Sequence, residues 1–225
     1  MDMRTLDRET QQNMTPAQAL ELLKAGNYRF VNNLKINRNL LQQVNDTSDG
    51  QHPFAVILSC IDSRTSAELI FDQGLGDVFS VRIAGNILNE DILGSMEFAC
   101  AVAGAKIVVV LGHTKCGAVG GACKGVKLGN LTGLLNKLQP AVDIAVADKT
   151  ITYAHDTYEF ADVVAGHNVH LTIERILNES PILNELVEEG KIGIAGAMYD
   201  VESGAVEFYE QDVYVGERVV VAKAV

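Results

Sequence analysis

Apolar runs and amphipathic segments alternate along the chain. The apolar runs at 54–59 and 106–111, the second of them dominated by Val and Ile, are typical of strands that are buried on both faces of a sheet. Further strands are expected at 78–83, 192–198 and 205–209, the last two joined by a turn at 200–204.

Helical periodicity fills most of the segments between the strands. Thr15 provides an N-cap, Pro16 suits the first helical position and Gln18 completes a capping box, which predicts a helix to about residue 33. Further helices are expected at about 66–71, 91–103, 131–147 and 153–177. The polar stretch 35–50 predicts a loop, because it ends in a cluster of turn-forming residues.

Strands that alternate with helices indicate an α/β fold with a mostly parallel central sheet flanked by helices and preceded by an N-terminal helical arm. The chain has 225 residues, of which 48% are hydrophobic, so it can bury one substantial core. We therefore expect a single domain over 1–225, with the arm at about 1–50 and the α/β core at 51–225.

Charge and the character of the amino-terminal segment restrict the partners and the compartment. The net charge of −11 argues against a nucleic-acid partner, because few Lys and Arg are left over to neutralise phosphates. The first 14 residues are polar and no apolar segment is long enough to span a bilayer. We expect a cytoplasmic protein with no membrane partner, whose cysteines act as ligands or thiols rather than in disulfides.

Three residues with metal-binding side chains follow two of the expected strands. Cys60 ends the first strand, and His113 and Cys116 follow the strand at 106–111. Carboxyl ends of neighbouring parallel strands meet at one edge of a sheet, so these residues can converge there. Two thiolates and one imidazole are a typical ligand set for one Zn²⁺ per chain with an open fourth position, although each residue alone also suits a packed core.

Asp62 and Arg64 lie beside the first cysteine. Two thiolates offset the charge of Zn²⁺, so such a site needs help from neighbouring groups to activate water. Asp62 can accept a hydrogen bond from the reacting oxygen, and Arg64 can hold that carboxylate bidentately. The alternative is a helix-capping carboxylate with a surface ion pair.

A non-catalytic zinc or thiol-sensing module would need a fourth protein ligand. Cys100 and Cys123 are the candidates. Cys100 falls in an apolar helix, and Cys123 lies about two helical turns beyond Cys116, too far away to share its metal.

Several motifs together resemble the β-carbonic anhydrase family. They are Cys60-x-Asp62-Ser63-Arg64, His113-x-x-Cys116, Gly26-Asn27-x-Arg29-Phe30, Val81-Arg82-x-Ala84-Gly85-Asn86 and Gly196-x-x-Tyr199-Asp200. The resemblance implies carbon dioxide and bicarbonate as substrate and product, attack on carbon dioxide by zinc-bound hydroxide, and an arm that embraces a second subunit in a homodimer or homotetramer. A zinc hydrolase of carbonyl sulfide or carbon disulfide on the same scaffold is the alternative.

Further residues take roles only from this resemblance. Gln51 matches a glutamine that hydrogen-bonds the substrate, and Phe79, Ala84 and Phe98 match an apolar pocket wall, although both phenylalanines also suit ordinary core packing. The chain contains no Trp and has Ser59 before Cys60, so it is similar to the plant-like branch of the family. That branch implies an Asp62 side chain that pairs with Arg64 and stays off the metal.

Overall fold

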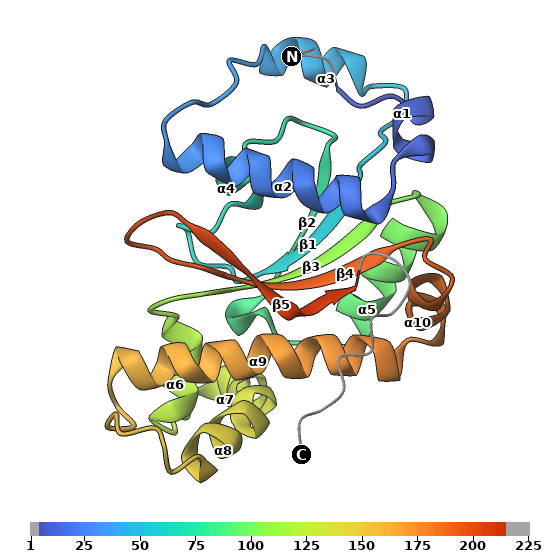
Figure 1. Cartoon of the computed structure of the whole chain (residues 1–225). Coiled ribbons are helices and arrows are strands. Elements are labelled where there is room, and N and C mark those ends of the chain that lie inside the picture. Colours follow the sequence, from blue (N-terminus) through green and yellow to red (C-terminus); the bar gives the residue numbers. More distant parts are fainter. Residues whose placement is uncertain (1–4, 215–225) are drawn as a thin grey trace.

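A five-stranded sheet with the order β2-β1-β3-β4-β5 forms the centre of the computed structural model (Figure 1). The strands are β1 (Ala55–Ser59), β2 (Val78–Arg82), β3 (Ile107–His113), β4 (Gly193–Tyr199) and β5 (Val206–Tyr214). Strands β1 to β4 are parallel and β5 is antiparallel to β4, which confirms the expected mostly parallel sheet. The structure describes residues 5–214, so residues 1–4 of the expected arm and 215–225 of the expected core lie outside the described part.

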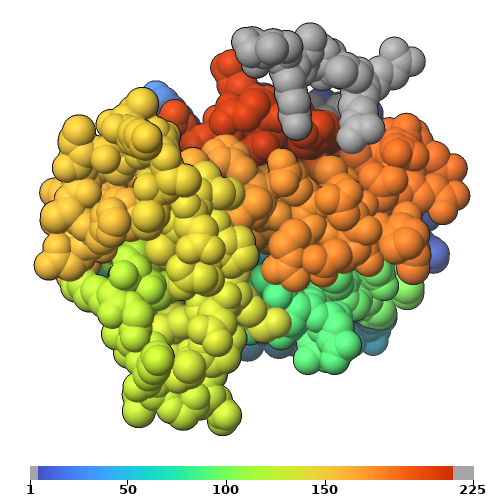
Figure 2. All heavy atoms as spheres, turned by 90° about the horizontal axis from the view of Figure 1, so that it is seen from below, coloured from blue at the N-terminus to red at the C-terminus, as the bar shows by residue number. Residues whose placement is uncertain are grey.

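Helices cover both faces of this sheet. They are α1 (Arg8–Asn13), α2 (Pro16–Val31), α3 (Leu40–Asp46), α4 (Ala67–Ile70), α5 (Glu90–Glu97), α6 (Gly117–Cys123), α7 (Gly129–Leu135), α8 (Gln139–Ala147), α9 (Tyr158–Glu179) and α10 (Pro181–Glu188), with short 3-10 turns at Ala84–Asn86 and Asn136–Leu138 and a π-helical turn at Phe98–Val102. Helix α2 lies on one face of the sheet and α9 on the other (Figure 1). Seen from below, α9 crosses the molecule, and α8 packs beside the amino-terminal part of this helix (Figure 2).

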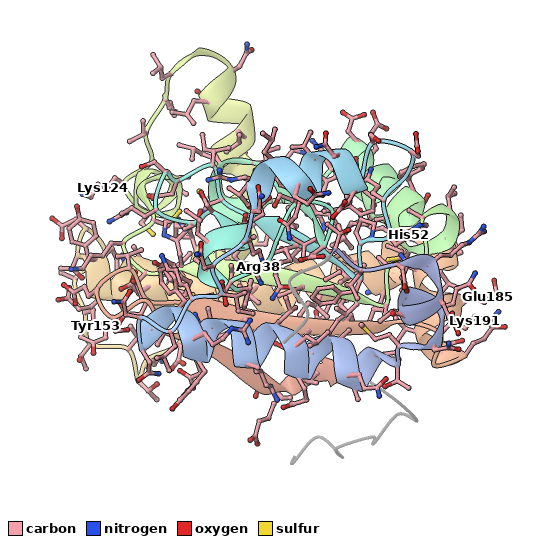
Figure 3. The ribbon with its side chains drawn as sticks, turned by 90° about the horizontal axis from the view of Figure 1, so that it is seen from above. Arg38, His52, Lys124, Tyr153, Glu185 and Lys191 are labelled. Atoms are coloured by element: carbon pink, nitrogen blue, oxygen red, sulfur yellow. The ribbon has the colours of Figure 1, made fainter. Side chains whose placement is uncertain are left out.

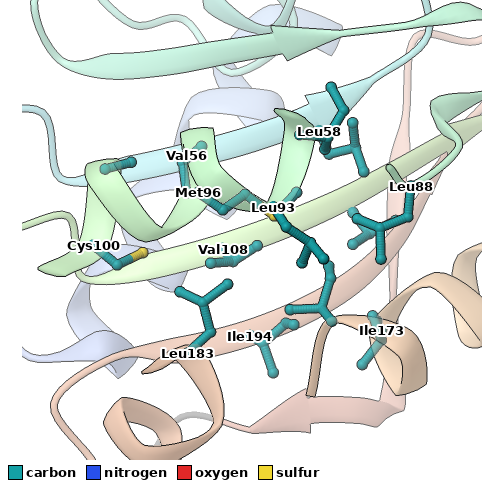
Figure 4. Packing of buried hydrophobic residues seen from close by; sticks show 14 of the residues in the cluster. Val56, Leu58, Leu88, Leu93, Met96, Cys100, Val108, Ile173, Leu183 and Ile194 are labelled. Carbon is teal, nitrogen blue, oxygen red and sulfur yellow. The ribbon is translucent and has the colours of Figure 1, made fainter. Parts of the chain in front are cut away.

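Alternating side chains of the strands supply two separate cores. Val56 and Leu58 of β1 point towards α5, α9 and α10, where they meet Met96, Ile173 and Leu183 (Figure 4). Ala55 and Ile57 of the same strand point the other way, into the core beneath α2 and α4. A strand with apolar residues on both faces is buried throughout, as the continuous apolar runs predicted.

The predicted start of α2 is confirmed. Thr15 accepts a hydrogen bond from the Gln18 N–H, the Gln18 side chain accepts one from the Thr15 N–H, and Pro16 occupies the first turn. No helix in the described part of the chain is both long enough and apolar enough to cross a membrane.

Three expectations about helices were wrong. The polar stretch 35–50 contains helix α3, which is N-capped by Asn39 and buries only Gln43. Leu40, Leu41 and Val44 lie at helical spacing in this helix, but all three are exposed, and so short an apolar pattern among polar residues does not distinguish a helix from a loop. Helices α1 and α10 were not anticipated because they are short, and the expected helix at 131–147 is divided into α7, a 3-10 turn and α8.

Candidate metal centre

The ends of the neighbouring strands β1 and β3 bring together three potential metal ligands. The two strands pair in parallel register, with Ser59 beside Leu111, so Cys60 immediately after β1 lies next to the end of β3. His113 is the last residue of β3, and Cys116 is the N-cap residue of α6. All three side chains are buried, in a local core that helices α6 to α9 complete.

The ligand atoms of these residues are already close enough to share one ion. They all lie within 4.8 Å of one another, and the two Sγ atoms are 3.9 Å apart. Two Zn–S bonds of about 2.3 Å at a tetrahedral angle would separate the sulfurs by about 3.8 Å. The spacing of the thiols therefore fits a metal ion without rearrangement.

The histidine presents one particular nitrogen to the sulfurs. Nδ1 of His113 donates to the Thr114 carbonyl at 2.9 Å, because a carbonyl can only accept. Nε2 is buried and has no hydrogen-bond partner among the described residues. A buried polar atom without a partner is costly, and a metal ion would satisfy it. The three donors therefore suit a metal ion.

The two thiols are electrostatically coupled. Hydrogen bonds from the Cys116 thiol and from the Gly85 N–H, whose nitrogen lies 3.3 Å from the Cys60 Sγ, lower the pKa of Cys60 to about 4, and the nearby His113 ring acts in the same direction. The hydrogen bond to Cys60, burial of the side chain and the negative charge of the Cys60 thiolate raise the pKa of Cys116. The fold thus stabilises one thiolate and leaves the second proton to be displaced when a cation binds.

Asp62 and Arg64 form a bidentate pair at the edge of the site. Arg64 donates from Nε to Oδ1 at 2.9 Å and from Nη2 to Oδ2 at 2.8 Å, and its N–H also bonds Oδ1 at 3.0 Å. Hydrogen bonds from the Arg64 side chain are the largest cause of the lowered pKa of Asp62, so the carboxylate is ionised at neutral pH. Both carboxylate oxygens are turned towards the guanidinium, and Asp62 is not part of the Cys60, His113 and Cys116 group.

Backbone contacts that the sequence did not suggest support both ligand loops. Arg82, the last residue of β2, donates to the carbonyls of Cys60 at 3.0 Å and Asp62 at 2.6 Å. On the other loop, the Lys115 N–H donates to Asp162 of α9 at 2.6 Å. Arg82 lies near the end of a predicted strand and could have been suspected. Nothing near Asp162 in the sequence indicates its contact with Lys115, since these two residues are 47 positions apart.

Of the four residues expected to contact substrate, Ala84 alone lies beside the ligands in a single chain. Its neighbour Gly85 donates to Cys60. Gln51 precedes β1 and therefore lies at the amino end of that strand, whereas Cys60 follows its carboxyl end. The five residues of β1 separate these two ends by about 16 Å.

Phe79 and Phe98 occupy another part of the surface. Phe79 pairs with Val56 and lies three residues, about 10 Å, before the end of β2. Its ring meets that of Phe98 edge to face at a centroid distance of 6.3 Å. The two rings line a shallow groove between β2 and α5, away from the metal ligands.

The remaining cysteines do not close the site. Cys100 lies in the core beneath α5, where burial raises its pKa to about 12. Cys123 is the last residue of α6, about 10 Å along the helix axis from Cys116. Within residues 5–214, no fourth Cys, His, Asp or Glu joins the three clustered ligands.

Comparison with known proteins identifies relatives that span almost the whole chain. A family profile described as carbonic anhydrase matches residues 55–206. Carbonic anhydrase 2 of Mycobacterium tuberculosis is 35% identical over 210 residues, which are 92% of this chain and 99% of that protein. The carbonic anhydrase of Mycolicibacterium smegmatis is 32% identical over 199 residues, covering 87% of this chain and 94% of that protein.

Solved structures agree with this relationship. The crystal structure of the β-carbonic anhydrase CafA of Aspergillus fumigatus superposes with a TM-score of 0.68 at 29% identity, covering 76% of this chain and 81% of that chain. A structure of one of two tetrameric β-carbonic anhydrases from Sordaria macrospora superposes with a TM-score of 0.67 at 27% identity, covering 72% and 83% of the two chains.

Proposed function

The chain belongs to the β-carbonic anhydrase family, and on that premise we propose that it catalyses the reversible hydration of carbon dioxide to bicarbonate and a proton with one Zn²⁺ per chain. The observation that carries the proposal is the buried cluster of Cys60, His113 and Cys116, in which Nε2 of His113 has no hydrogen-bond partner among the described residues. Thiolate and imidazole ligands favour zinc over magnesium or calcium, which prefer oxygen.

Zinc held by these three residues would supply a Lewis acid that lowers the pKa of water. The two thiolates cancel much of the charge of the cation, so the groups around the ion have to assist. The ionised Asp62 carboxylate is available as a hydrogen-bond acceptor that orients the attacking water. Arg64 occupies both oxygens of Asp62 and so keeps this carboxylate off the metal. Ser59 and the absence of Trp support placement in the plant-like branch.

In this proposal the apolar wall of the substrate pocket, expected from Phe79, Ala84 and Phe98, is built by residues from more than one chain. Ala84 lies beside Cys60, but Gln51, Phe79 and Phe98 of the same chain do not. Phe98 is 54% exposed next to the edge strand β2, and an edge strand and an exposed aromatic ring both favour pairing with another copy. We propose that a second copy in a homodimer, or in a homotetramer, supplies Gln51, Phe79 and Phe98 to the pocket.

Two measurements on one preparation test the activity. Metal content should be one zinc per chain, and stopped-flow mixing with carbon dioxide should show hydration well above the buffer rate. A zinc-loaded protein that hydrolyses carbonyl sulfide or carbon disulfide but does not accelerate carbon dioxide hydration would contradict the proposal.

A substitution at the exposed phenylalanine tests the shared pocket. Phe98→Glu should shift the protein to smaller species in sedimentation and lower kcat/KM, while Leu128→Glu, which changes another exposed apolar residue, should do neither. A Phe98→Glu protein of unchanged size and activity would contradict the contribution of a second copy.

A further inference from the structure

The loop between β3 and α6 carries two of the three metal ligands through a strained residue. His113 and Cys116 are separated only by Thr114 and Lys115, and Lys115 has a φ of 55°. This left-handed conformation is unfavourable for a residue with a side chain, and it persists only where its surroundings hold it. The positions of both ligands depend on it, because Lys115 is adjacent to Cys116 and two residues from His113.

Asp162, which lies in α9, contacts the backbone of Lys115. Its Oδ1 accepts a hydrogen bond from the Lys115 N–H at 2.6 Å. The Lys115 side chain does not contribute to this contact, because its ammonium pairs with Glu202. Asp162 therefore acts on the main chain of the loop.

Partial burial of the Asp162 carboxylate costs free energy, because it removes water from the ionised group. Asp162 is half-buried, and desolvation raises its pKa even though the Lys115 N–H and the nearby His113 favour the ionised form. Glu159, one turn earlier on the same helix, is exposed and adds repulsion.

Helix α9 is a rigid support for such a contact. Phe160 and Val164, on either side of Asp162, are buried in the core that surrounds the ligands. Farther along the helix, Asn168 donates to the Gly85 carbonyl at 3.0 Å, and Gly85 in turn donates to the Cys60 sulfur. The same helix therefore braces the loops that carry all three ligands.

We propose that Asp162 is a positioning residue of the metal centre, whose carboxylate holds the left-handed Lys115 peptide so that His113 and Cys116 keep their ligand atoms together. This inference rests on the proposed zinc site. It differs from a purely structural role because loss of the contact should alter the metal and its ligand field while the rest of the fold is unchanged.

Metal binding to the full chain provides the test. Asp162→Ala should weaken zinc affinity, measured by competition with a chelating dye, by about 10–100-fold, as is typical for groups that orient ligands. It should also change the visible absorption bands of the Co²⁺-substituted protein. Asp162→Asn retains an oxygen acceptor and should keep a near wild-type affinity and spectrum, and Glu159→Ala, which removes a nearby charge without this contact, should match wild type.

A second substitution tests whether the effect passes through the backbone. Glycine adopts positive φ without strain, so Lys115→Gly should reduce the loss of zinc affinity that Asp162→Ala causes. Circular dichroism of the zinc-free proteins checks that each variant folds. If Asp162→Ala does not fold, the zinc affinities of Asp162→Asn and of Lys115→Gly/Asp162→Ala test the inference instead.

The outcomes are distinguishable. Wild-type affinity and spectrum in Asp162→Ala, an Asp162→Asn protein as impaired as Asp162→Ala, or an undiminished loss in the Lys115→Gly background would overturn the inference and leave the zinc site intact. If Cys116→Ala binds Co²⁺ with the wild-type spectrum, the ligand assignment itself is wrong, and the inference fails with it.

Discussion

At the scale of single residues, the metal centre combines groups that stabilise negative charge with groups that keep it in place. The pKa of Cys60 is lowered by hydrogen bonds from its neighbours, and that of Asp62 by Arg64. The backbone carbonyls of Cys60 and Asp62 also accept hydrogen bonds from Arg82. The ligands therefore need little reorganisation when a cation binds, which favours tight binding.

Removal of one thiolate should abolish stable zinc binding. Cys116→Ala leaves two protein ligands, too few to hold the ion, so the purified protein should contain much less than one zinc per chain by elemental analysis. Cys123→Ala is the matched control, because Cys123 lies at the far end of α6. Full zinc content in Cys116→Ala would show that the ligand set is wrong.

Asp62→Asn should separate metal binding from turnover. The amide keeps the size of the side chain but loses the charge that Arg64 pairs with, so kcat/KM for carbon dioxide hydration should fall by about 10–100-fold while zinc content stays at one per chain. The exposed neighbour Ser63 offers the control Ser63→Ala, which should keep activity. Activity of Asp62→Asn equal to wild type would remove Asp62 from the mechanism.

At the scale of elements, helix α2 packs unusually closely on the turn after α4. A Cβ built on Gly26 would lie 1.8 Å from the carbonyl oxygen of Phe71. The next residue, Asn27, is buried and ties the same helix to the strand β5, since its Oδ1 accepts from the Val206 N–H at 2.9 Å. The glycine that weakens the helix locally is thus the residue that permits its docking.

Gly26→Ala should therefore destabilise the protein although alanine is the better helix former. The clash involves backbone, so we expect a loss of about 3 kcal/mol or more in the free energy of unfolding by urea. Gly133→Ala in the exposed part of α7 meets nothing within 4 Å and should stabilise by about 0.5–1 kcal/mol. Equal effects of the two substitutions would contradict the close approach.

At the scale of the whole molecule, one buried carboxylate joins segments from the amino-terminal region to the core. Asp72 accepts hydrogen bonds from Arg29 of α2 and, at 2.7 Å, from Arg38. Arg38 lies between α2 and α3 (Figure 3). Burial alone would raise the pKa of Asp72, but the two guanidinium groups and the Ile36 N–H outweigh it and lower the pKa. The pair of arginines thus fastens the helical arm to the end of α4.

The stability that Asp72 provides should depend on pH in a defined direction. Its pKa is about 3.9 in the unfolded chain and lower in the folded one, so its contribution is fully present above about pH 5 and is lost as pH falls through the folded pKa. Asp72→Asn should cost about 1–3 kcal/mol at pH 7, from the lost charged hydrogen bonds, and this difference from wild type should shrink below pH 4.

Urea unfolding of both proteins at pH 7, 5 and 3.5 measures this difference. Asp49→Asn changes an exposed carboxylate and should stay within about 0.5 kcal/mol of wild type at each pH. If Asp72→Asn lowered the free energy of unfolding by the same amount at all three pH values, the proposed pH dependence of the Asp72 contribution would be wrong.

The amino-acid sequence was sufficient to predict the class of the fold, and its motifs already resembled those of the family. Continuous or alternating apolar patterns predicted all five strands, because successive side chains of a strand point to opposite faces of the sheet. Cys60, His113 and Cys116 could be grouped from the order of those strands, since parallel neighbours end at one edge. Helices α1 and α3 are harder to predict, because such short helices depend on caps and tertiary contacts more than on a buried apolar stripe. The sequence of α10 does contain helix signals, since Ser180 is its N-cap, Pro181 lies in its first turn and Leu183, Leu186 and Val187 share one face.

The side chains that support the site from distant parts of the chain could be identified only in the folded protein. Asp162 is 47 residues from the Lys115 N–H that it holds, and no local pattern encodes such a pairing. The fold likewise separates Gln51 from Cys60 by the length of β1, although only nine positions divide them in sequence. An extended strand carries near neighbours apart and a helix packed across a sheet brings distant residues together, so contacts of this kind follow from three-dimensional packing alone.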